Sequence, residues 1–325
     1  MLINISDVWK TAYASHNRYL EKCINEGIKS LKKTSIEKPA TQFLNFLRIQ
    51  LTAKSPSGLQ SSIRYYEKLK RKISRHERSV LDSFLRKTFD YKKFTSKRVH
   101  CWSAYKLCKS STYKICPYCH HAYMLTTKEA EKGIRPDLDH YYPQHRYPYL
   151  ALALHNLIPS CSICNSRLKG AEDTGDHSYL HPLFDSESLH FRCEKPGSTI
   201  VDIVSDFENI KDQLKVRITY DPTCAKSVNT LRMFQLHERY DLFSQQGADF
   251  VGSKTSIDGL DELLQAHAIG PLQEGAFLAL PPSKEKEMRQ LRFDRERYKH
   301  YLHGKMFADL YDQFDRTSLL SRPYP

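Results

Sequence analysis

Apolar residues recur at three- and four-residue steps along the N-terminal part of the chain. Over residues 6–33 this spacing places them on one face of an α-helix. The same spacing predicts helices over 39–52, 60–73 and 76–90, and the segment at 55–58 (SPSG) predicts a loop between the two helical pairs. The chain is therefore expected to begin with a helical lobe.

The pattern changes over residues 111–185, which are rich in Cys, His, Pro and Tyr and show little periodicity. Small modules built around a metal ion have this character, because the ion replaces part of the apolar core. Farther along, alternating apolar and polar residues predict a β-hairpin within 198–220, from the segments STIVDIV and LKVRITY. Residues 224–246 and 282–313 are predicted to be helical.

These patterns predict an α+β protein that is mostly helical and has three parts. Residues 1–110 would form a basic helical N-terminal lobe, and residues 111–185 a small central module. Residues 186–325 would form a mostly helical C-terminal lobe with a possible β-hairpin. The chain has 325 residues, of which 40% are hydrophobic, so burying a core in such lobes is not a difficulty.

The cysteine content points to metal binding. No apolar run approaches the 18 residues that a membrane helix needs, and the start, MLINISDVWK, lacks the basic-then-apolar pattern of a signal peptide. We therefore expect a cytoplasmic protein. In a reducing compartment the nine cysteines are better explained by metal ligation and packing than by disulfides.

The positive charge is concentrated before the central module. The net charge is +13, and residues 60–110 hold 15 Lys and Arg against 4 Asp and Glu. A basic stretch beside a nearly neutral module indicates a polyanion that is held by one part and processed by another. We expect nucleic-acid contacts at the basic cluster, defined as Lys70, Arg71, Lys72 and Arg75. The alternative is a solvated helical face.

Two Cys-x-x-Cys pairs, separated by 41 residues, predict a structural zinc site. Each pair forms a knuckle whose two thiolates bind one ion, and two knuckles complete a tetrahedral set with no open position. One Zn²⁺ per chain is therefore expected at Cys116, Cys119, Cys161 and Cys164.

The segment between and after these knuckles resembles the HNH (ββα-metal) endonuclease superfamily. That family combines a Cys-x-x-Cys, an Asp-His pair ending a strand, an Asn-Leu opening the next, and a second Cys-x-x-Cys followed by His or Asn and Lys-Gly. The chain has these elements in order as CPYC, LDHYYP, HNLIPSCSIC and NSRLKG, over about 55 residues. Their ordered combination is far more specific than any one of them.

The resemblance implies a metal-dependent phosphodiester hydrolase. His140 would act as general base, since a neutral imidazole titrates near working pH. Asp139 and Asn165 would hold a catalytic Mg²⁺ or Mn²⁺, whose hard character suits oxygen ligands; Asp137 is the main competitor for the ligand role. Asn156 would hold the loop and orient His140, and Arg167 and Lys169 would contact phosphate.

Within the superfamily the segment is most similar to HNH proteins of bacterial anti-phage systems, above all the nuclease of Septu-type and retron-associated systems. That resemblance implies a nuclease acting with an ABC-type or SMC-like ATPase. DNA is the favoured substrate on family frequency. RNA, such as tRNA, stays open because the hydrolysis needs no 2′-hydroxyl. A non-catalytic zinc module that binds nucleic acid is the third alternative, although it would not need Asp139, His140 and Asn165 together.

Overall fold

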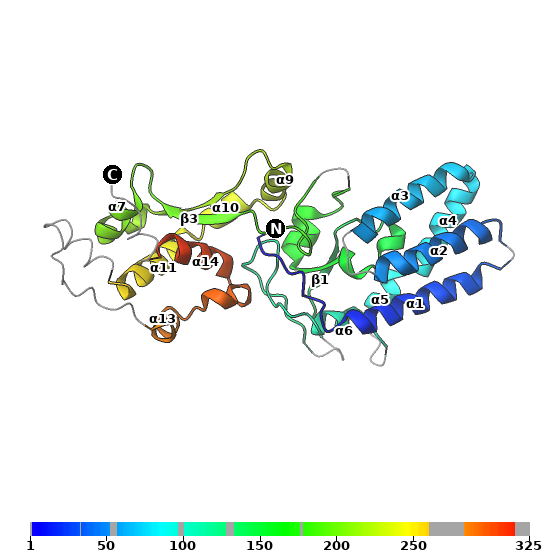
Figure 1. Cartoon of the computed structure of the whole chain (residues 1–325), viewed down its shortest axis with the longest axis horizontal. Helices are drawn as coiled ribbons and strands as arrows, with labels where there is room; N and C mark the ends of the chain where they lie inside the picture. The colour runs from blue at the N-terminus through cyan, green and yellow to red at the C-terminus, as the bar shows by residue number, and fades with distance from the viewer. Residues whose placement is uncertain are drawn as a thin grey trace. The chain divides into compact units, whose positions relative to one another are not determined.

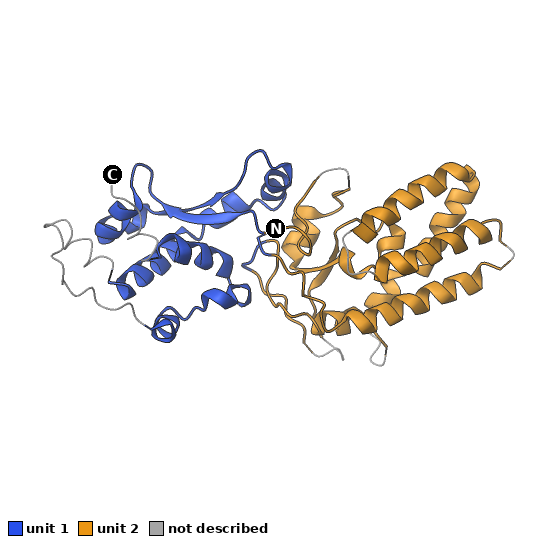
Figure 2. Cartoon of the chain, in the orientation of Figure 1, with its two compact units in different colours: residues 1–3, 119–121, 187–325 blue, residues 4–118, 122–186 orange. Residues whose placement is uncertain are grey.

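The structure is a computed structural model of the chain, and it describes residues 2–32, 34–52, 57–96, 101–127, 133–175, 178–259 and 283–315. The described chain divides into two compact units (Figure 2). Unit 2 comprises residues 4–118 and 122–186, and unit 1 comprises residues 1–3, 119–121 and 187–325. The predicted three-part division at 110 and 185 stays a prediction.

Unit 2 contains the predicted N-terminal helices (Figure 1). The four predicted helices correspond to α1 (Tyr13–Ser30), α2 (Glu37–Thr52), α3 (Ser57–Lys72) and α4 (Arg75–Thr88). Two short helices that the sequence did not predict follow them, α5 (Tyr91–Thr95) and α6 (Ala104–Lys109). The prediction began the first helix too early, because residues 6–12 form turns. Ser57 and Gly58, predicted as loop, already belong to α3, and residues 55 and 56 lie outside the described residues.

The helices of unit 2 pack through apolar faces and one close approach. Helix α2 packs against both α1 and α3, and it buries Phe43, Leu44 and Leu47. Gly58 permits the contact between α2 and α3, because a Cβ there would collide with the carbonyl of Gln50. These helices form the frame against which the central segment of unit 2 folds.

That central segment contains a short antiparallel hairpin followed by a helix. Strand β1 (Asp137–His140) pairs with β2 (Leu157–Ser160), with His140 opposite Leu157. Between the strands lie the 3₁₀ turns η1 (Pro148–Leu150) and η2 (Leu154–Asn156), and after them comes the helix η3 (Ile163–Lys169). Helix η3 contacts β1, so the order is strand, strand and helix.

Unit 1 holds a different hairpin from the one predicted within 198–220. LKVRITY does contain a strand, β4 (Lys215–Thr219), but its partner is β3 (His190–Glu194). STIVDIV instead forms helix α7 (Ile200–Ser205). The reason is a capping box: Thr199 accepts a hydrogen bond from the amide of Asp202, and the Asp202 carboxylate accepts one from the amide of Thr199.

The two predicted helical ranges of unit 1 are broken into shorter helices. They contain α9 (Ala225–Met233), α10 (Leu236–Asp241), α13 (Lys284–Leu291), η5 (Arg295–His300) and α14 (Gly304–Gln313). The sequence did not predict α8 (Phe207–Ile210) or η4 (Lys211–Gln213), and α11 (Ser244–Ile257) lies mostly beyond the predicted range. The predicted helix over 224–246 is interrupted at Gln235, which has a left-handed backbone conformation. Residue 282, in the other predicted helix, lies outside the described residues.

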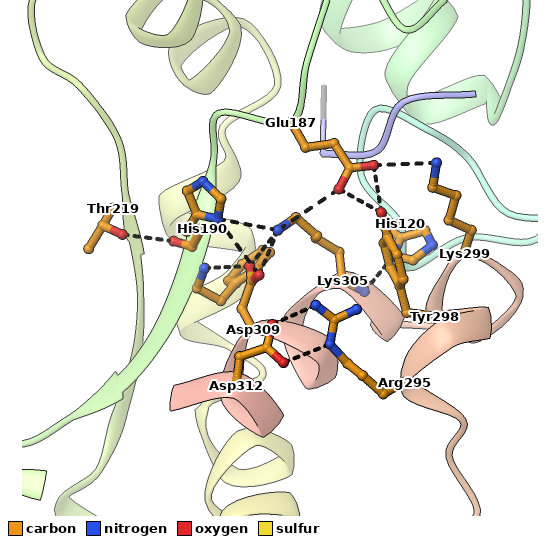
Figure 3. A network of polar contacts seen from close by, with 11 residues as sticks. His120, Glu187, His190, Thr219, Arg295, Tyr298, Lys299, Lys305, Asp309 and Asp312 are labelled. Carbon is orange, nitrogen blue, oxygen red and sulfur yellow. Dashed lines mark hydrogen bonds and ion pairs between the residues drawn. The ribbon is translucent and has the colours of Figure 1, made fainter. Parts of the chain in front are cut away.

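Helix α14 completes the hydrogen bonding of strand β3. The amides of Phe191 and Cys193 donate to the side chains of Asp309 and Gln313, both at 2.9 Å. Lys305, one helical turn before Asp309, is buried and donates to its carboxylate (Figure 3). The edge of this two-stranded sheet is therefore covered by side chains of one helix, which satisfies polar groups that would otherwise be left open.

Figure 3 also shows how acidic residues neutralise the cations around α14. Arg295 makes a two-pronged contact with Asp312, and Glu187 accepts a hydrogen bond from Tyr298. Lys299 lies 3.7 Å from Glu187. Since these charges are matched within unit 1, we assign the network a role in packing this unit. The described chain is thus a mostly helical α+β protein with small two-stranded sheets, as predicted.

Candidate active site and metal centre

Strand β1 and helix η3 bring several of the predicted site residues together around one cavity. The cavity has a volume of about 480 Å³, and its lining includes Asp137, Asp139, His140, Asn165 and Lys169. The helix lies along the strand, so residues four apart on η3 meet residues two apart on β1. Asn165 contacts Asp137, and Lys169 contacts Asp139.

His140 is held in a neutral form by its surroundings. The side chain is 8% exposed, and burial lowers its pKa below the usual 6.5. Its Nε2 lies 2.9 Å from the carbonyl oxygen of Ala151. Because a carbonyl only accepts hydrogen bonds, Nε2 carries the proton and Nδ1 is the nitrogen that can accept another. The ring of Tyr91, from helix α5, packs edge-on at 4.4 Å between centroids and fixes its plane.

Asp139 belongs to a buried ion pair. Its Oδ1 accepts a hydrogen bond from the Lys169 ammonium at 2.8 Å, and its Oδ2 accepts one from the Tyr118 hydroxyl at 2.6 Å. Both ionic side chains are 3% exposed. Lys169 also donates to the carbonyl of His140 at 2.8 Å. Lys169, which the sequence suggested as a phosphate contact, is therefore buried in the protein, where it holds the end of β1.

Asp137 lies at the more open end of the same strand face. Its Oδ2 accepts a hydrogen bond from the Asn165 amide at 3.0 Å and one from the Ser166 hydroxyl at 3.3 Å. Both of these side chains are neutral, whereas the carboxylate of Asp139 is compensated by a lysine. Asp137 and Asn165 thus place a carboxylate and an amide side by side on the cavity wall, which is the donor chemistry that hard divalent cations prefer.

Asn156 is fully buried and holds the loop that follows His140. Its Oδ1 accepts from the amide of Tyr142 at 2.7 Å, and its Nδ2 donates to the carbonyls of Tyr142 and Leu150, both at 3.0 Å. One amide side chain therefore fixes both ends of the loop segment 142–150. The next residue is Ala151, whose carbonyl holds His140, so Asn156 acts on the imidazole through the backbone.

The remaining predicted contacts lie apart from the cavity wall. Arg167 is exposed on η3 and is not among the residues that line the cavity. In the basic cluster, Lys70 pairs with Glu67 at 2.6 Å, whereas Arg71, Lys72 and Arg75 are exposed. Figure 1 places the turn between α3 and α4 at the end of the helices opposite β1. These residues are not among those that line the cavity.

The four predicted zinc ligands come together in space. The ligand atoms of Cys116, Cys119, Cys161 and Cys164 all lie within 4.8 Å of one another. Three of these cysteines are buried, and Cys161 is half-buried. The amide of Cys164 donates to the sulfur of Cys161 at 3.5 Å, which suits a thiolate acceptor in a knuckle. Four sulfurs gathered without disulfide bonds fit a tetrahedral zinc ion.

Sequence reasoning missed the residues that support the catalytic candidates. Tyr118 was visible only as a middle residue of the first knuckle, and the pattern Cys-x-x-Cys places no demand on that position. Tyr91 lies 49 positions before His140, in another helix, and no local signal connects the two. The group of Ala151 that contacts His140 is its backbone carbonyl, which every residue has, so the residue type at this position could not have predicted the contact.

Comparison with curated proteins finds one relevant similarity. Over 76 residues the chain is 33% identical to the Septu protein PtuB of Bacillus thuringiensis. The alignment covers 21% of this chain and 29% of the relative, so the chain spans less than a third of the relative's length. No family model and no solved structure matches the chain. In the described residues, no helix has both the length and the apolar character that a bilayer span requires.

We expect one tightly bound zinc ion per chain. Replacing a ligand in Cys161→Ser removes a thiolate from the four-sulfur set, so the protein should lose zinc and much of its soluble yield, since metal-binding energy is also folding energy. Cys224→Ser is the matched control, because Cys224 lies outside the cluster and caps helix α9, where serine is well accommodated. Elemental analysis of the purified proteins gives the metal content. Folded wild-type protein without zinc would contradict the assignment.

We also expect Lys169→Met to destabilise the protein strongly. The substitution leaves the buried Asp139 carboxylate without its counter-ion, which costs about 3–5 kcal/mol in such pairs. The control is Arg167→Met on the exposed part of the same helix, with a change within about 0.5 kcal/mol. Adding Asp139→Asn to Lys169→Met should restore part of the loss. Urea unfolding measures all three, and a Lys169→Met protein as stable as the control would show that the pair contributes little.

Proposed function

We propose that the protein is a metal-dependent HNH endonuclease, and that it hydrolyses phosphodiester bonds in nucleic acid. The observation that carries the proposal is the cavity at β1 and η3, where an imidazole that donates through Nε2 lies beside two carboxylates and an amide. Hydrolysis of a phosphodiester requires an activated water and stabilisation of the departing oxygen. The imidazole would activate the water, and the carboxylates and the amide would hold a divalent cation that stabilises the departing oxygen.

In the proposed mechanism His140 accepts a proton from the attacking water. Its neutral form and its fixed Nε2–H prepare Nδ1 for that role. Asn156 keeps the loop segment 142–150 in place, and Ala151 thereby keeps the imidazole oriented. Lys169 maintains Asp139 at the end of β1.

Asn165, Asp137 and Asp139 would hold a divalent cation, Mg²⁺ or Mn²⁺. Such an ion, when bound, stabilises negative charge on the phosphate and the leaving oxygen. The donor set fits, because a carboxylate has about four acceptor sites and Asp139 uses two of them for Lys169 and Tyr118. The neutral partners of Asp137 make it the stronger candidate of the two carboxylates, which changes the order of preference drawn from the sequence.

The biological setting we propose is anti-phage defence, in which the nuclease acts with an ABC-type or SMC-like ATPase. The similarity to Septu protein PtuB supports this setting. DNA is the proposed substrate, and RNA is the alternative that the same chemistry permits. A direct assay separates them: the protein, alone and with the proposed ATPase partner, is incubated with plasmid, single-stranded DNA and total RNA in Mg²⁺, Mn²⁺ or EDTA. Cleavage that EDTA does not suppress would contradict the metal dependence.

We expect His140→Ala to reduce cleavage by about 10²–10⁴-fold, which is the usual contribution of a positioned general base. Zinc content and binding of uncleaved nucleic acid should be unchanged. His145→Ala is the control, because His145 lines the same cavity and is exposed. Asp137→Asn and Asp139→Asn should instead raise the Mg²⁺ concentration needed for half-maximal rate. A fully active His140→Ala protein would rule out the mechanism.

We expect reversal of the basic cluster, with Lys70, Arg71, Lys72 and Arg75 all changed to Glu, to weaken nucleic-acid binding regardless of sequence. The physical reason is loss of counterion release, so the salt dependence of binding should flatten as well. Because the cluster does not line the cavity, the cleavage rate at saturating substrate should suffer less. Unchanged binding together with loss of the ATPase complex would assign this face to the protein partner. A variant normal in both respects would leave the cluster as a solvated face.

A further inference from the structure

Unit 2 contains a second cavity, which has no lining residue in common with the candidate active site. Its volume is about 540 Å³, and its walls come from α1, α4, α5 and residues 101–103. Helix α5 separates the two cavities: Lys93 lines this one, whereas Tyr91 and Thr95 line the other.

The walls of this second cavity combine aromatic and cationic side chains. Tyr19, Phe84 and Trp102 supply the aromatic surface, and all three are half-buried. Four cationic side chains also line the cavity, including Lys22 and Lys93, against the two acidic residues Glu26 and Asp90. The pair between Lys22 and Glu26 is long, at 3.8 Å, and lies in solvent, where such a pair contributes little.

These walls match the chemistry of a nucleotide. Nucleobases stack on aromatic side chains, with little regard for which base is present, and phosphates are bound by lysine and arginine. A cavity of this volume lies within the usual range for cofactor and ligand sites. We propose that the second cavity is a nucleotide-binding site, which takes the base against the aromatic surface and the phosphates against the lysines. The nucleotide could be free or the end of a strand, since the chemistry is shared.

One structural route connects this site to His140 through helix α5. Phe94 of α5 is buried against Tyr19 of the cavity wall, with 5.3 Å between ring centroids. Tyr91 of the same helix packs its ring on His140 at 4.4 Å. Helix α5 has only five residues, so a shift of Phe94 would be transmitted to Tyr91.

A second route runs through a buried histidine. The indole N–H of Trp102 donates to Nδ1 of His16 at 3.1 Å, and Nε2 of His16 donates to the carbonyl of Leu152 at 2.7 Å. His16 is fully buried, and burial lowers its pKa to about 4, so it is neutral and this tautomer is fixed. The neighbouring carbonyl, that of Ala151, holds His140. The carbonyls of two consecutive residues thus connect the second cavity, through His16, with the imidazole of His140.

The coupling of the two cavities rests on the proposed nuclease function, whereas nucleotide binding does not. A nucleotide that stacks on Trp102 or displaces Tyr19 would change the position of His140 by either route. Occupancy should therefore alter the cleavage rate rather than the affinity for the nucleic acid that is cleaved.

Binding is tested on the full chain by calorimetry with ATP, adenosine, inorganic triphosphate and a short 5′-phosphorylated DNA. ATP should bind more tightly than adenosine or triphosphate, because it engages both walls, and it should quench tryptophan fluorescence. The quench should disappear in Trp102→Phe, which keeps an aromatic ring and should keep most of the affinity. Stronger binding of the DNA end than of ATP, if Lys22→Glu with Lys93→Glu abolishes it, would assign the site to a strand. Saturable binding by neither, up to millimolar concentration, would overturn the proposal.

Lys22→Glu with Lys93→Glu should weaken ATP binding about tenfold or more, as expected when two charged contacts to phosphate are lost. Lys29→Glu with Lys92→Glu is the matched control, because it makes the same charge change at exposed positions of the same two helices that do not line the cavity. An equal loss in both variants would show only a general effect of charge. If ATP binds as expected but leaves the cleavage rate unchanged, the proposed coupling to His140 is wrong, whereas the second cavity is still a nucleotide-binding site. If no cleavage is found at all, the binding measurement still decides the site.

Discussion

The buried ion pair between Lys169 and Asp139 is the contact on which the candidate site depends. It joins the last turn of η3 to the end of β1, and the same ammonium also binds the backbone of His140. With that end fixed, one turn of helix brings Asn165 to Asp137. A charge pair this deeply buried gains little net stability over apolar residues, but it tolerates few alternative registers, because a slip by one residue would bury an unpaired charge.

The π-helical geometry of η3 also helps to position the candidate site. The amide of Gly170 bonds the carbonyl of Asn165, five residues back, so the helix is wider than an α-helix at this point. Gly170 ends it with a positive φ of 53°, a conformation that glycine adopts at low cost. The second knuckle leads directly into this helix, so the cysteines and the oxygen donors are positioned by the same few residues.

The sequence predicted the local parts of this site because each has a short-range pattern. The paired cysteines, the Asp-Leu-Asp-His strand and the Asn after the second knuckle are all visible within a few positions. The contacts between these parts were harder to predict, since the alternation of side chains along a strand does not show which carboxylate contacts which residue of the helix. The structure pairs Asp137 with Asn165 and Asp139 with Lys169, and only the packing of η3 on β1 decides this.

The same reasoning explains the error over residues 198–220. Apolar alternation in STIVDIV favoured a strand, but the capping box of Thr199 and Asp202 offered the backbone a better local arrangement. The true partner of β4 is HFRCE at 190–194, whose alternating burial is as regular but which was hidden in a stretch of mixed charge. Strand pairing is a long-range choice, and short segments carry too little pattern to determine it.

The two proposed metal sites differ in softness, and this difference protects each from the other's ion. Four thiolates favour zinc over magnesium, whereas a carboxylate and an amide offer only hard oxygen donors. The residues that line the cavity at β1 and η3 include no cysteine or methionine, although Cys161 and Cys164 lie just before Asn165 in the chain. Cys164, at the start of η3, lies with the other cysteines, whereas Asn165 in the same helix contacts Asp137 of β1. One short helix therefore places the sulfur ligands and the oxygen ligands in separate sites. That separation would let a structural ion be held permanently while the proposed hydrolytic site exchanges its own.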